Sequence, residues 1–196
     1  MKKHIKQVLL IVDDMILRRV VKFLWPQYKR QRKGHLTHWY VIKKYFIPQK
    51  VLRINGDVPW PVDFRSSVSG WKNIEKGIMC DPGDNPGLYI NAWGGLKIGS
   101  NCAFAANTTI TTTNHDIYNH SRQSKVKGIE IGDNVWVGTN CAIVAGAKIG
   151  DNVTIGPNCT IRGEIPDNTI VVAGRDTLKF VKKKPYKWDW SKEELL

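Results

Sequence analysis

The sequence lacks the features of a membrane-spanning or secreted protein. No apolar run approaches the roughly 18–20 residues that a membrane-spanning helix needs, and the longest candidate, Val8–Val12, ends at Asp13 and Asp14. The basic start Met1–Lys3 precedes an apolar segment that is too short for a secretory signal. The four cysteines have no C-x-x-C spacing of the kind found in metal sites. We therefore expect a protein that is made and kept in a reducing cytoplasm.

Acidic residues are scarce at the amino-terminal end. Residues 1–53 contain 14 basic and 2 acidic side chains, whereas residues 54–174 contain 9 and 11, and residues 175–196 contain 7 and 4. The net charge of +13 thus belongs to the two ends. Basic ends favour an acidic partner such as a membrane surface, a nucleic acid or a phosphate group. The length of 196 residues and the 42% hydrophobic content fit one globular domain with an appendage.

The middle of the chain contains a repeat of six residues. An aliphatic residue recurs every six positions, and a second small or apolar residue follows each by four, at Ile131, Val137, Ile143, Ile149, Ile155 and Ile161 and at Val135, Cys141, Ala147, Val153, Cys159 and Ile165. A shorter block runs from Ile98 until Asn114 breaks it. This period fits neither a helix nor simple strand alternation. It favours a repetitive β-structure over the alternative, a β-sandwich with regular turns.

A six-residue period is typical of a chain that turns through a third of a circle after each short straight piece. Three such pieces make a triangular coil of about 18 residues, and stacked coils bury one continuous core. The corners need Gly or Asn, because some of these positions require positive φ. We expect Cys141 and Cys159 to stack in adjacent coils about 4.8 Å apart. They are interpreted as small buried side chains, with a functional thiol pair as the alternative.

This pattern resembles the hexapeptide-repeat acyltransferases over roughly residues 54–181. The likeness is strongest over Asn114–Ile165, and it extends to Pro86–Gly99, both similar to the maltose, galactoside and polysaccharide O-acetyltransferase branch. The resemblance implies a mainly β fold, a left-handed parallel β-helix. We expect a basic, aromatic and helical region at residues 1–53, the β-helix acyltransferase domain at residues 54–181 with an excursion loop at residues 113–128, and a short carboxy-terminal tail at residues 182–196.

The interruption between Thr113 and Gly128 is the candidate catalytic segment, because loops that leave a solenoid often carry function. A histidine at the edge of a rigid coil can act as a general base near neutral pH. The resemblance implies that His115 is this base, since the family's catalytic histidine opens such a loop. Asp116 would orient the site or cap the loop, and His120 would line the acceptor cleft or be solvated. Two histidines without a third ligand predict no metal site.

The resemblance further implies acetyl-CoA as the acyl donor, bound in a groove between the subunits of a homotrimer. By position, Trp136, Gly138 and Thr139 would flank the thioester, with the Thr139 N–H as a candidate oxyanion donor. Transfer would be direct, because no serine or cysteine is suitably placed as a nucleophile. On the acceptor side, Asn91 would bind a sugar hydroxyl or serve as a corner residue, and Trp93 would stack on a sugar face.

The sequence departs from the family at the expected CoA site. Pro157 stands where the family has an alanine whose N–H can contact the pantetheine arm, and proline has no N–H. The family's closing Gly-Asn-Pro-Ala-Lys is replaced by Gly174–Leu178. The phosphates of CoA still require cations, for which the candidates are Arg162, Arg175, Lys179 and Lys182–Lys184. The lysine-rich tail after Lys179 is expected to form a short helix or to fray.

The amino-terminal region predicts an amphipathic helix over residues 3–24 that ends before Pro26. Its apolar positions are Ile5, Leu9, Val12, Ile16, Val20 and Phe23. Basic residues with aromatic residues at 39–46 suit a membrane interface, so residues 1–50 are a candidate for peripheral membrane contact near a lipid-linked saccharide. The alternative is that these helices pack on the β-helix or on a trimer mate. No nucleic-acid-binding motif is found.

The leading hypothesis is an acetyl-CoA-dependent O-acetyltransferase that acts on a saccharide hydroxyl, in a surface polysaccharide or its lipid-linked precursor. It would work in the cytoplasm, with a peripheral position at the inner face of the membrane. Two alternatives are a non-catalytic β-helix scaffold and a trimeric metalloenzyme of the carbonic-anhydrase type. The metalloenzyme needs three converging histidines, and residues 131–165 contain none.

Overall fold

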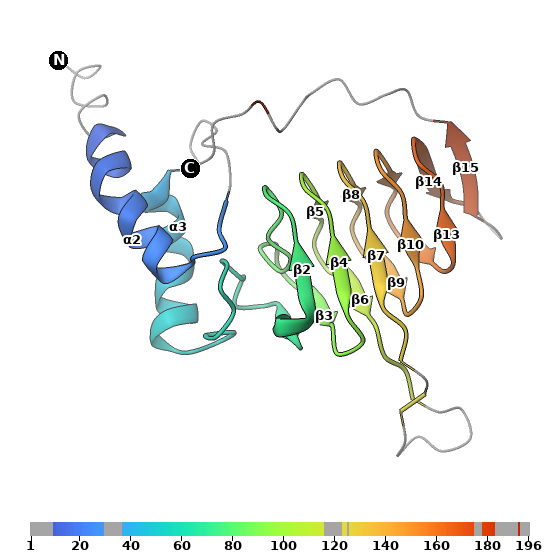
Figure 1. Cartoon of the computed structure of the whole chain (residues 1–196), viewed down its shortest axis with the longest axis horizontal. Helices are drawn as coiled ribbons and strands as arrows, with labels where there is room; N and C mark the ends of the chain where they lie inside the picture. Colours follow the sequence, from blue (N-terminus) through green and yellow to red (C-terminus); the bar gives the residue numbers. More distant parts are fainter. Residues whose placement is uncertain are drawn as a thin grey trace.

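The computed structural model describes residues 10–29, 37–115, 123–124, 126–174, 178–182 and 192. Two helical arms precede a β-structure. The first arm is η1 (Asp13–Leu17) continued by α2 (Arg18–Leu24), and the second is α3 (His38–Tyr45) continued by η2 (Phe46–Val51). The first arm ends before Pro26, as predicted. Figure 1 shows α2 and α3 packed together beside the first coils, with β15 at the opposite end of the molecule.

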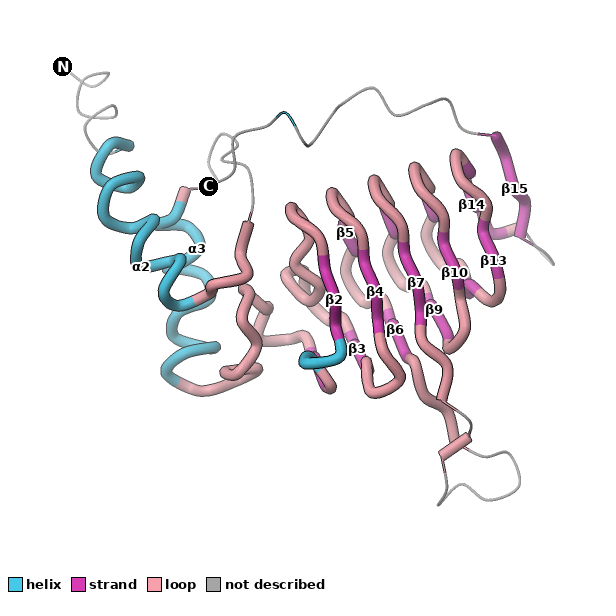
Figure 2. The backbone as a smooth tube through the Cα atoms, viewed as in Figure 1, coloured by secondary structure: helices cyan, strands magenta, loops and turns pink. Residues whose placement is uncertain are grey.

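Short strands build a parallel β-helix (Figures 1 and 2). Its section is triangular, because each coil from β3 onward gives one strand to each of three sheets, whereas the first coil gives only β1 and β2. Sheet 1 contains β1 (Ser67–Ser69), β3 (Tyr89–Asn91), β6 (Thr109–Thr111), β9 (Ala142–Val144) and β12 (Thr160–Ile161). Sheet 2 contains β2 (Ile74–Lys76), β4 (Leu96–Ile98), β7 (Ile129–Ile131), β10 (Lys148–Ile149) and β13 (Glu164–Ile165). Sheet 3 contains β5 (Ala103–Phe104), β8 (Trp136–Val137), β11 (Thr154–Ile155), β14 (Thr169–Ala173) and β15 (Leu178–Lys182). The short helix η3 (Trp71–Asn73) precedes β2.

The register confirms the coil predicted from the repeat. Trp136 pairs with Thr154, and Ala142 pairs with Thr160, so equivalent positions lie 18 residues apart. All twelve hexad positions from Ile131 to Ile165 are buried. Cys141 and Cys159 directly precede the paired Ala142 and Thr160 and are both buried, which confirms that they stack.

The three corners of the prism use different residues. Corner I joins sheet 1 to sheet 2, corner II joins sheet 2 to sheet 3, and corner III joins sheet 3 to sheet 1. Corners II and III contain asparagines with φ between 55° and 60°, at Asn101, Asn134, Asn152 and Asn168 and at Asn107, Asn140 and Asn158. Corner I instead contains Gly95, Gly146 and Gly163, with φ between 70° and 89°. The predicted need for positive φ is therefore confirmed.

The helical arms have their own small core of Val21, Trp25, Tyr28, Val41 and Tyr45, apart from the core of the coils. The fully buried Gln49 side chain connects the two parts. Its Oε1 accepts from Trp25 Nε1 at 2.8 Å and from Val62 N at 3.1 Å, and its Nε2 donates to Trp60 O at 2.9 Å. None of the described helices combines the length and the apolar character needed to cross a membrane.

The carboxy-terminal part of the described chain corrects one expectation. Leu178–Lys182 form β15, which pairs antiparallel with β14 and places Lys179 opposite Val172. The segment after Lys179 is therefore extended as far as Lys182, where a short helix or a frayed end was expected. The sequence did not indicate this strand, because its lysines resemble those of a solvated tail. Charged residues are common in strands at the edge of a sheet, and β15 lies at the edge of sheet 3.

Candidate active site

The excursion leaves the β-helix at corner I, and hydrogen bonds hold its base. Thr112 is buried, and its Oγ1 donates to Asn91 O at 2.9 Å and accepts from Gly94 N at 2.7 Å. Ser124 N donates to Asn114 O at 2.8 Å, and His115 forms an antiparallel bridge with Gln123. The two ends of the excursion therefore meet beside the coil.

His115 lies at this base with its side chain exposed. It is one of the first residues beyond the rigid coil, because β6 ends at Thr111 and Thr111 Oγ1 still hydrogen-bonds to Thr113 O at 2.9 Å. An exposed imidazole on an anchored backbone can exchange protons with a bound hydroxyl group. The position is compatible with the predicted base, and the ring does not enter the apolar core.

Asn91 and Trp93 occupy the same corner one coil earlier. Asn91 pairs with Thr111 across β3 and β6, and its side chain lies half-buried on the outer face. Trp93 is 62% exposed. Gly94 packs so closely on the excursion base that an added Cβ would lie 2.4 Å from Val126 Cγ1. The structure thus brings both predicted acceptor residues to the same corner as His115.

The residues predicted to flank the thioester lie in β8 and at corner III, which follows it. Trp136 begins β8 and points outward from sheet 3 with 49% exposure. Gly138 faces the next coil so tightly that an added Cβ would lie 2.7 Å from Pro157 N. Asn158 N donates to Thr139 O at 2.9 Å. Within the described residues, no acceptor receives the Thr139 N–H, so this group is available to a ligand oxygen.

One chain does not bring the two groups together. His115 follows a strand of sheet 1, at corner I, whereas Gly138 and Thr139 precede a strand of sheet 1, at corner III. At about 3.3 Å per residue, the chain from Asn140 to Ala145 separates these corners by roughly 16 Å. Arg162 follows β12 and is exposed at corner I, so it lies on the side of His115 and apart from Pro157.

Three predicted residues, Asp116, His120 and Arg175, lie outside the described residues. The backbone of Lys179 is described within β15, but its side chain is not. Lys182 is exposed at the end of the same strand, and Lys183 and Lys184 again lie outside the described part.

The sequence did not indicate a pocket of about 280 Å³ between α3 and sheet 3. Trp136 lines it together with Tyr40 and Lys44 from α3 and with Asp84 and Asn85 from the loop before β3. Aromatic rings combined with carboxylate and amide groups can bind a polar ligand. No periodic signal could have revealed this pocket, because the helices and the coil are joined only by tertiary packing.

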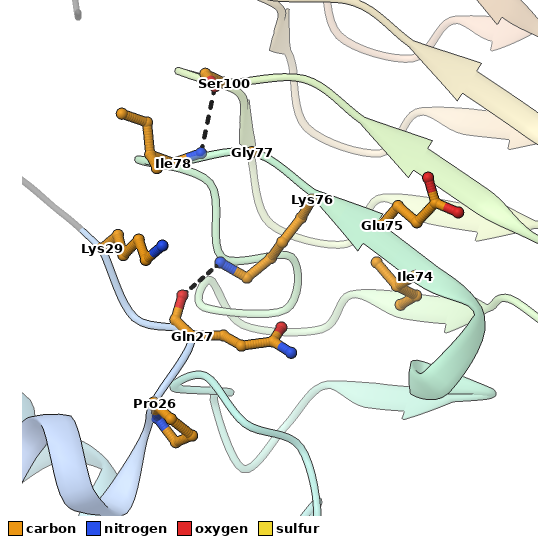
Figure 3. Close-up of a pocket in the computed structure, with 9 residues that line it drawn as sticks. All are labelled: Pro26, Gln27, Lys29, Ile74, Glu75, Lys76, Gly77, Ile78 and Ser100. Atoms are coloured by element: carbon orange, nitrogen blue, oxygen red, sulfur yellow. Dashed lines mark hydrogen bonds between the residues drawn. The ribbon is translucent and has the colours of Figure 1, made fainter.

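A second groove of about 590 Å³ lies between residues 26–29 and β2 (Figure 3). Lys76 crosses it, and its Nζ donates to Gln27 O at 2.8 Å and to Asp81 Oδ1 at 3.2 Å. The ammonium group also lies 5.5 Å from the centre of the Trp60 ring. Through these contacts Lys76 attaches residues 26–29 to the first coil. We therefore interpret the groove as a structural contact between the two parts.

The comparisons with known proteins agree with the repeat and the fold. Residues 128–163 match the family described as bacterial transferase hexapeptide (six repeats). This part of the chain contains hexapeptide repeats. The match covers the coils that follow the excursion, including β8 and both stacked cysteines.

Solved structures share the fold of this chain. A maltose O-acetyltransferase from Clostridium difficile 630 is 22% identical, with a TM-score of 0.53, over 85% of this chain and 97% of that one. A galactoside acetyltransferase in complex with coenzyme A is 20% identical, with a TM-score of 0.52, over 85% and 80%. A point mutant of AntD, an N-acyltransferase from Bacillus cereus, in complex with dTDP and coenzyme A is 13% identical, with a TM-score of 0.51, over 64% and 81%. The expected left-handed parallel β-helix is thereby confirmed.

The outer faces of the β-helix differ in charge. Across sheet 2, acidic and basic side chains alternate in register at Glu75, Lys97, Glu130, Lys148 and Glu164. Lys97 Nζ lies 3.9 Å from Glu75 Oε2, and Lys148 Nζ lies 3.6 Å from Glu164 Oε1. The outward positions of sheet 1 and of β5, β8, β11 and β14 in sheet 3 contain no charged residue. The outer face of sheet 2 is therefore suited to exposure to solvent. The outer face of sheet 1 and that of β5, β8, β11 and β14 in sheet 3 are suited to contact another molecule.

The cysteines of this chain are unsuited to nucleophilic attack. All four are free and buried. Burial raises the pKa of Cys141 and of Cys159, and the neighbouring Cys141 thiol raises that of Cys159 further. The contact with Cys102, together with burial, raises the pKa of Cys80 well above its usual value. A thiol held in its protonated form is a poor nucleophile.

Proposed function

We propose that this protein is an acetyl-CoA-dependent O-acetyltransferase that acetylates a hydroxyl group of a saccharide, in a surface polysaccharide or its lipid-linked precursor. The observation that carries the proposal is the exposed His115 on the anchored base of the excursion, next to Asn91 and Trp93. This corner offers a base, a polar side chain and an aromatic face, which together suit a sugar hydroxyl.

The proposed reaction is a direct transfer. His115 takes the proton of the acceptor hydroxyl while its oxygen attacks the thioester carbonyl of acetyl-CoA. The Thr139 N–H stabilises the oxyanion that develops on the carbonyl oxygen. When this intermediate collapses, the carbon–sulfur bond breaks, and the departing CoA sulfur takes the proton from the imidazolium. The protonated, buried cysteines support a route without an acyl-enzyme.

The other residues of the proposed site bind the sugar and CoA. Asn91 and Trp93 hold the sugar, with Asp116 and His120 from the excursion beside it. Trp136, Gly138 and Thr139 flank the thioester, and Pro157 lines the groove without donating a hydrogen bond. The phosphates of CoA are bound by Arg162, Arg175 and Lys179. No metal takes part.

The site is proposed to form between neighbouring copies in a homotrimer. The base and the oxyanion donor stand at different corners of one chain, so a second copy must supply one of them. The uncharged outward positions of sheet 1 and of β5, β8, β11 and β14 in sheet 3 support such packing, because charged residues are depleted in interface cores. In this proposal residues 54–181 are the acyltransferase domain, and residues 1–53 and 182–196 are appendages.

The proposal places the enzyme in the cytoplasm, at the inner face of the membrane. Four unpaired cysteines suit a reducing compartment, in which disulfides do not persist. A lipid-linked saccharide would be presented at this face, and acetyl-CoA would reach the site from the aqueous side.

The decisive experiment is replacement of the proposed base. His115→Ala should lower kcat for acetyl transfer to a saccharide by at least about 10²-fold, the lower end of a general-base contribution. Gln123→Ala, across the same β-bridge, is the matched control and should retain most activity. Circular dichroism and thermal unfolding should be unchanged in both variants. Near-normal turnover by a folded His115→Ala enzyme would remove His115 from the role.

A further inference from the structure

The first helical arm exposes its apolar side. Six large side chains of η1 and α2 and the residues before them face outward in what we call the exposed stripe: Ile11, Val12, Met15, Ile16, Val20 and Phe23. Phe23 is 85% exposed. The arm packs on the rest of the protein through its other side, where Asp13, Val21 and Trp25 are buried. Single exposed apolar residues are normal, but a contiguous row marks an interaction surface.

This arrangement reverses the usual orientation of a surface helix, whose apolar side faces the core. Val12, Ile16, Val20 and Phe23 belong to the apolar pattern visible in the sequence, and the described structure leaves all four in contact with solvent. The arm does not depend on them for its position. Instead, Asp13 Oδ1 accepts from Trp39 N at 2.9 Å, and Asp13 Oδ2 accepts from His38 N at 3.0 Å and contacts His38 Nδ1 at 2.8 Å.

The charge on the exposed side of this arm is positive. Arg19 and Lys22 are exposed among the residues of the stripe, and Arg18 lies next to them. The two acidic residues of the arm turn toward α3, because Asp13 is buried there and Asp14 Oδ1 lies 3.9 Å from His38 Nδ1. The arm therefore separates its charges, with acidic groups toward the protein and basic groups toward the outside.

Apolar side chains interspersed with exposed basic ones match the surface of an anionic membrane, with its hydrocarbon edge and negative headgroups. A second copy of this chain is a poorer match, because the exposed Arg19 and Lys22 would need an acidic partner. The outward positions of sheet 1 and of β5, β8, β11 and β14 in sheet 3 contain no charged residue, and sheet 2 has its acidic groups interleaved with lysines. Trp39, exposed at the start of α3 beside Asp13, adds an aromatic ring of the type found at membrane interfaces.

We propose that the exposed stripe is a membrane-docking surface. The arm lies in the plane of an anionic lipid surface, with Ile16, Val20 and Phe23 inserted at the level of the headgroups and Arg19 and Lys22 in contact with lipid phosphates. This inference goes beyond the proposed transferase activity and does not depend on it. One side of the arm, rather than the basic region as a whole, binds the membrane.

The test is flotation of the full-length protein with vesicles. Wild type should bind vesicles of mixed phosphatidylglycerol and phosphatidylcholine, and binding should weaken in high salt and with phosphatidylcholine alone. The Phe23→Glu variant should lower the partition constant at least tenfold. Arg19→Gln with Lys22→Gln should lower it roughly 25-fold, since each basic residue near the surface contributes a factor of about five.

The matched control is Phe180→Glu, because Phe180 is a 54% exposed aromatic on β15 at the opposite end of the molecule. This variant should bind vesicles like wild type. Unchanged binding by Phe23→Glu would overturn the proposal. So would a loss of oligomeric mass in Phe23→Glu with no change in vesicle binding, which would assign the stripe to a second copy. Acetyl transfer to a soluble acceptor by Phe23→Glu should equal wild type, which keeps this test distinct from that of His115.

Discussion

Thr139 and Pro157 occupy the same corner position in successive coils, but only Thr139 has a backbone N–H. Gly138-Thr139-Asn140-Cys141 and Gly156-Pro157-Asn158-Cys159 stand 18 residues apart, and Asn140 and Asn158 have nearly the same φ, 56° and 60°. The backbone at this position accepts proline, since Pro157 already occupies it one coil later. Pro157 lacks the N–H that Thr139 has, and that group is the proposed oxyanion donor.

This equivalence allows a substitution that removes the hydrogen bond donor and keeps the turn. Thr139→Pro should lower kcat about 10²–10³-fold, the range for loss of one oxyanion donor. Thr139→Ala retains the N–H and should stay within a few-fold of wild type. Steady-state kinetics and thermal unfolding of both variants make the comparison. Equal activity of the two variants would exclude the Thr139 N–H as the donor.

At the scale of elements, the contact between η1 and α3 depends on one buried carboxylate. Burial alone would raise the pKa of Asp13, but hydrogen bonds from Trp39 N and from His38 outweigh it and lower this pKa. A carboxyl group whose pKa is lowered by folding stabilises the folded state at pH values above its ordinary pKa of about 3.9. That contribution is lost as the pH falls through the lowered value.

The Asp13→Asn variant should therefore be less stable than wild type near neutral pH, by about 1.5–3 kcal/mol for hydrogen bonds to a charged group. The difference should shrink as the pH falls below about 4, because Asp13 of the unfolded chain then takes up a proton, and it should vanish once the pH passes the lowered pKa of folded Asp13. Urea unfolding at a series of pH values measures this. Asp14→Asn, in the same turn and 42% exposed, is the control and should change stability by at most about 0.5 kcal/mol. A constant difference at all pH values would contradict the assignment.

The position of the helical arms shows what periodicity cannot reveal. The apolar spacing over residues 3–24 predicts a helix, and the described residues confirm it as far as Leu24. The same spacing does not say whether its apolar side meets protein, lipid or water. The polar contacts of Asp13 and Gln49 determine which side of the arm packs on the protein, and neither residue belongs to a repeat.

At the scale of the whole molecule, the separation of corners I and III makes assembly part of the proposed mechanism. A cyclic trimer has identical head-to-tail contacts, so each site would combine corner I of one copy with corner III of the next. The charged ladder on sheet 2 leaves sheets 1 and 3 for these contacts. Each active site should then require two neighbouring copies of the chain.

A subunit-mixing experiment tests this directly. His115→Ala and Thr139→Pro should each be inactive alone, whereas trimers assembled from equal amounts of both should recover about a quarter of wild-type activity, because one site in four pairs an intact His115 with an intact Thr139. Trimers that mix His115→Ala with wild type serve as the reference for correct assembly. Failure of the two variants to complement would place both residues in one copy's site.

The sequence by itself determined the triangular coil, its buried positions, its corner residues and the place where the excursion leaves it. These features follow from local rules, since a six-residue period and positive φ at Asn or Gly act over a few residues. The resemblance also selected His115, Asn91 and Trp93, which the fold gathers at corner I. The sequence did not indicate the row of alternating charges across sheet 2, because successive members of this row are between 16 and 33 residues apart.

Only the tertiary structure decided how these parts face one another. It set Trp136, Thr139 and Pro157 at a different corner from His115, because the width of sheet 1 lies between them. It also turned the apolar side of the first arm outward, because buried hydrogen bonds of Asp13 and Gln49 hold the arms from the other side. Such contacts join residues that are distant in the chain, and their energies depend on burial that no local pattern records.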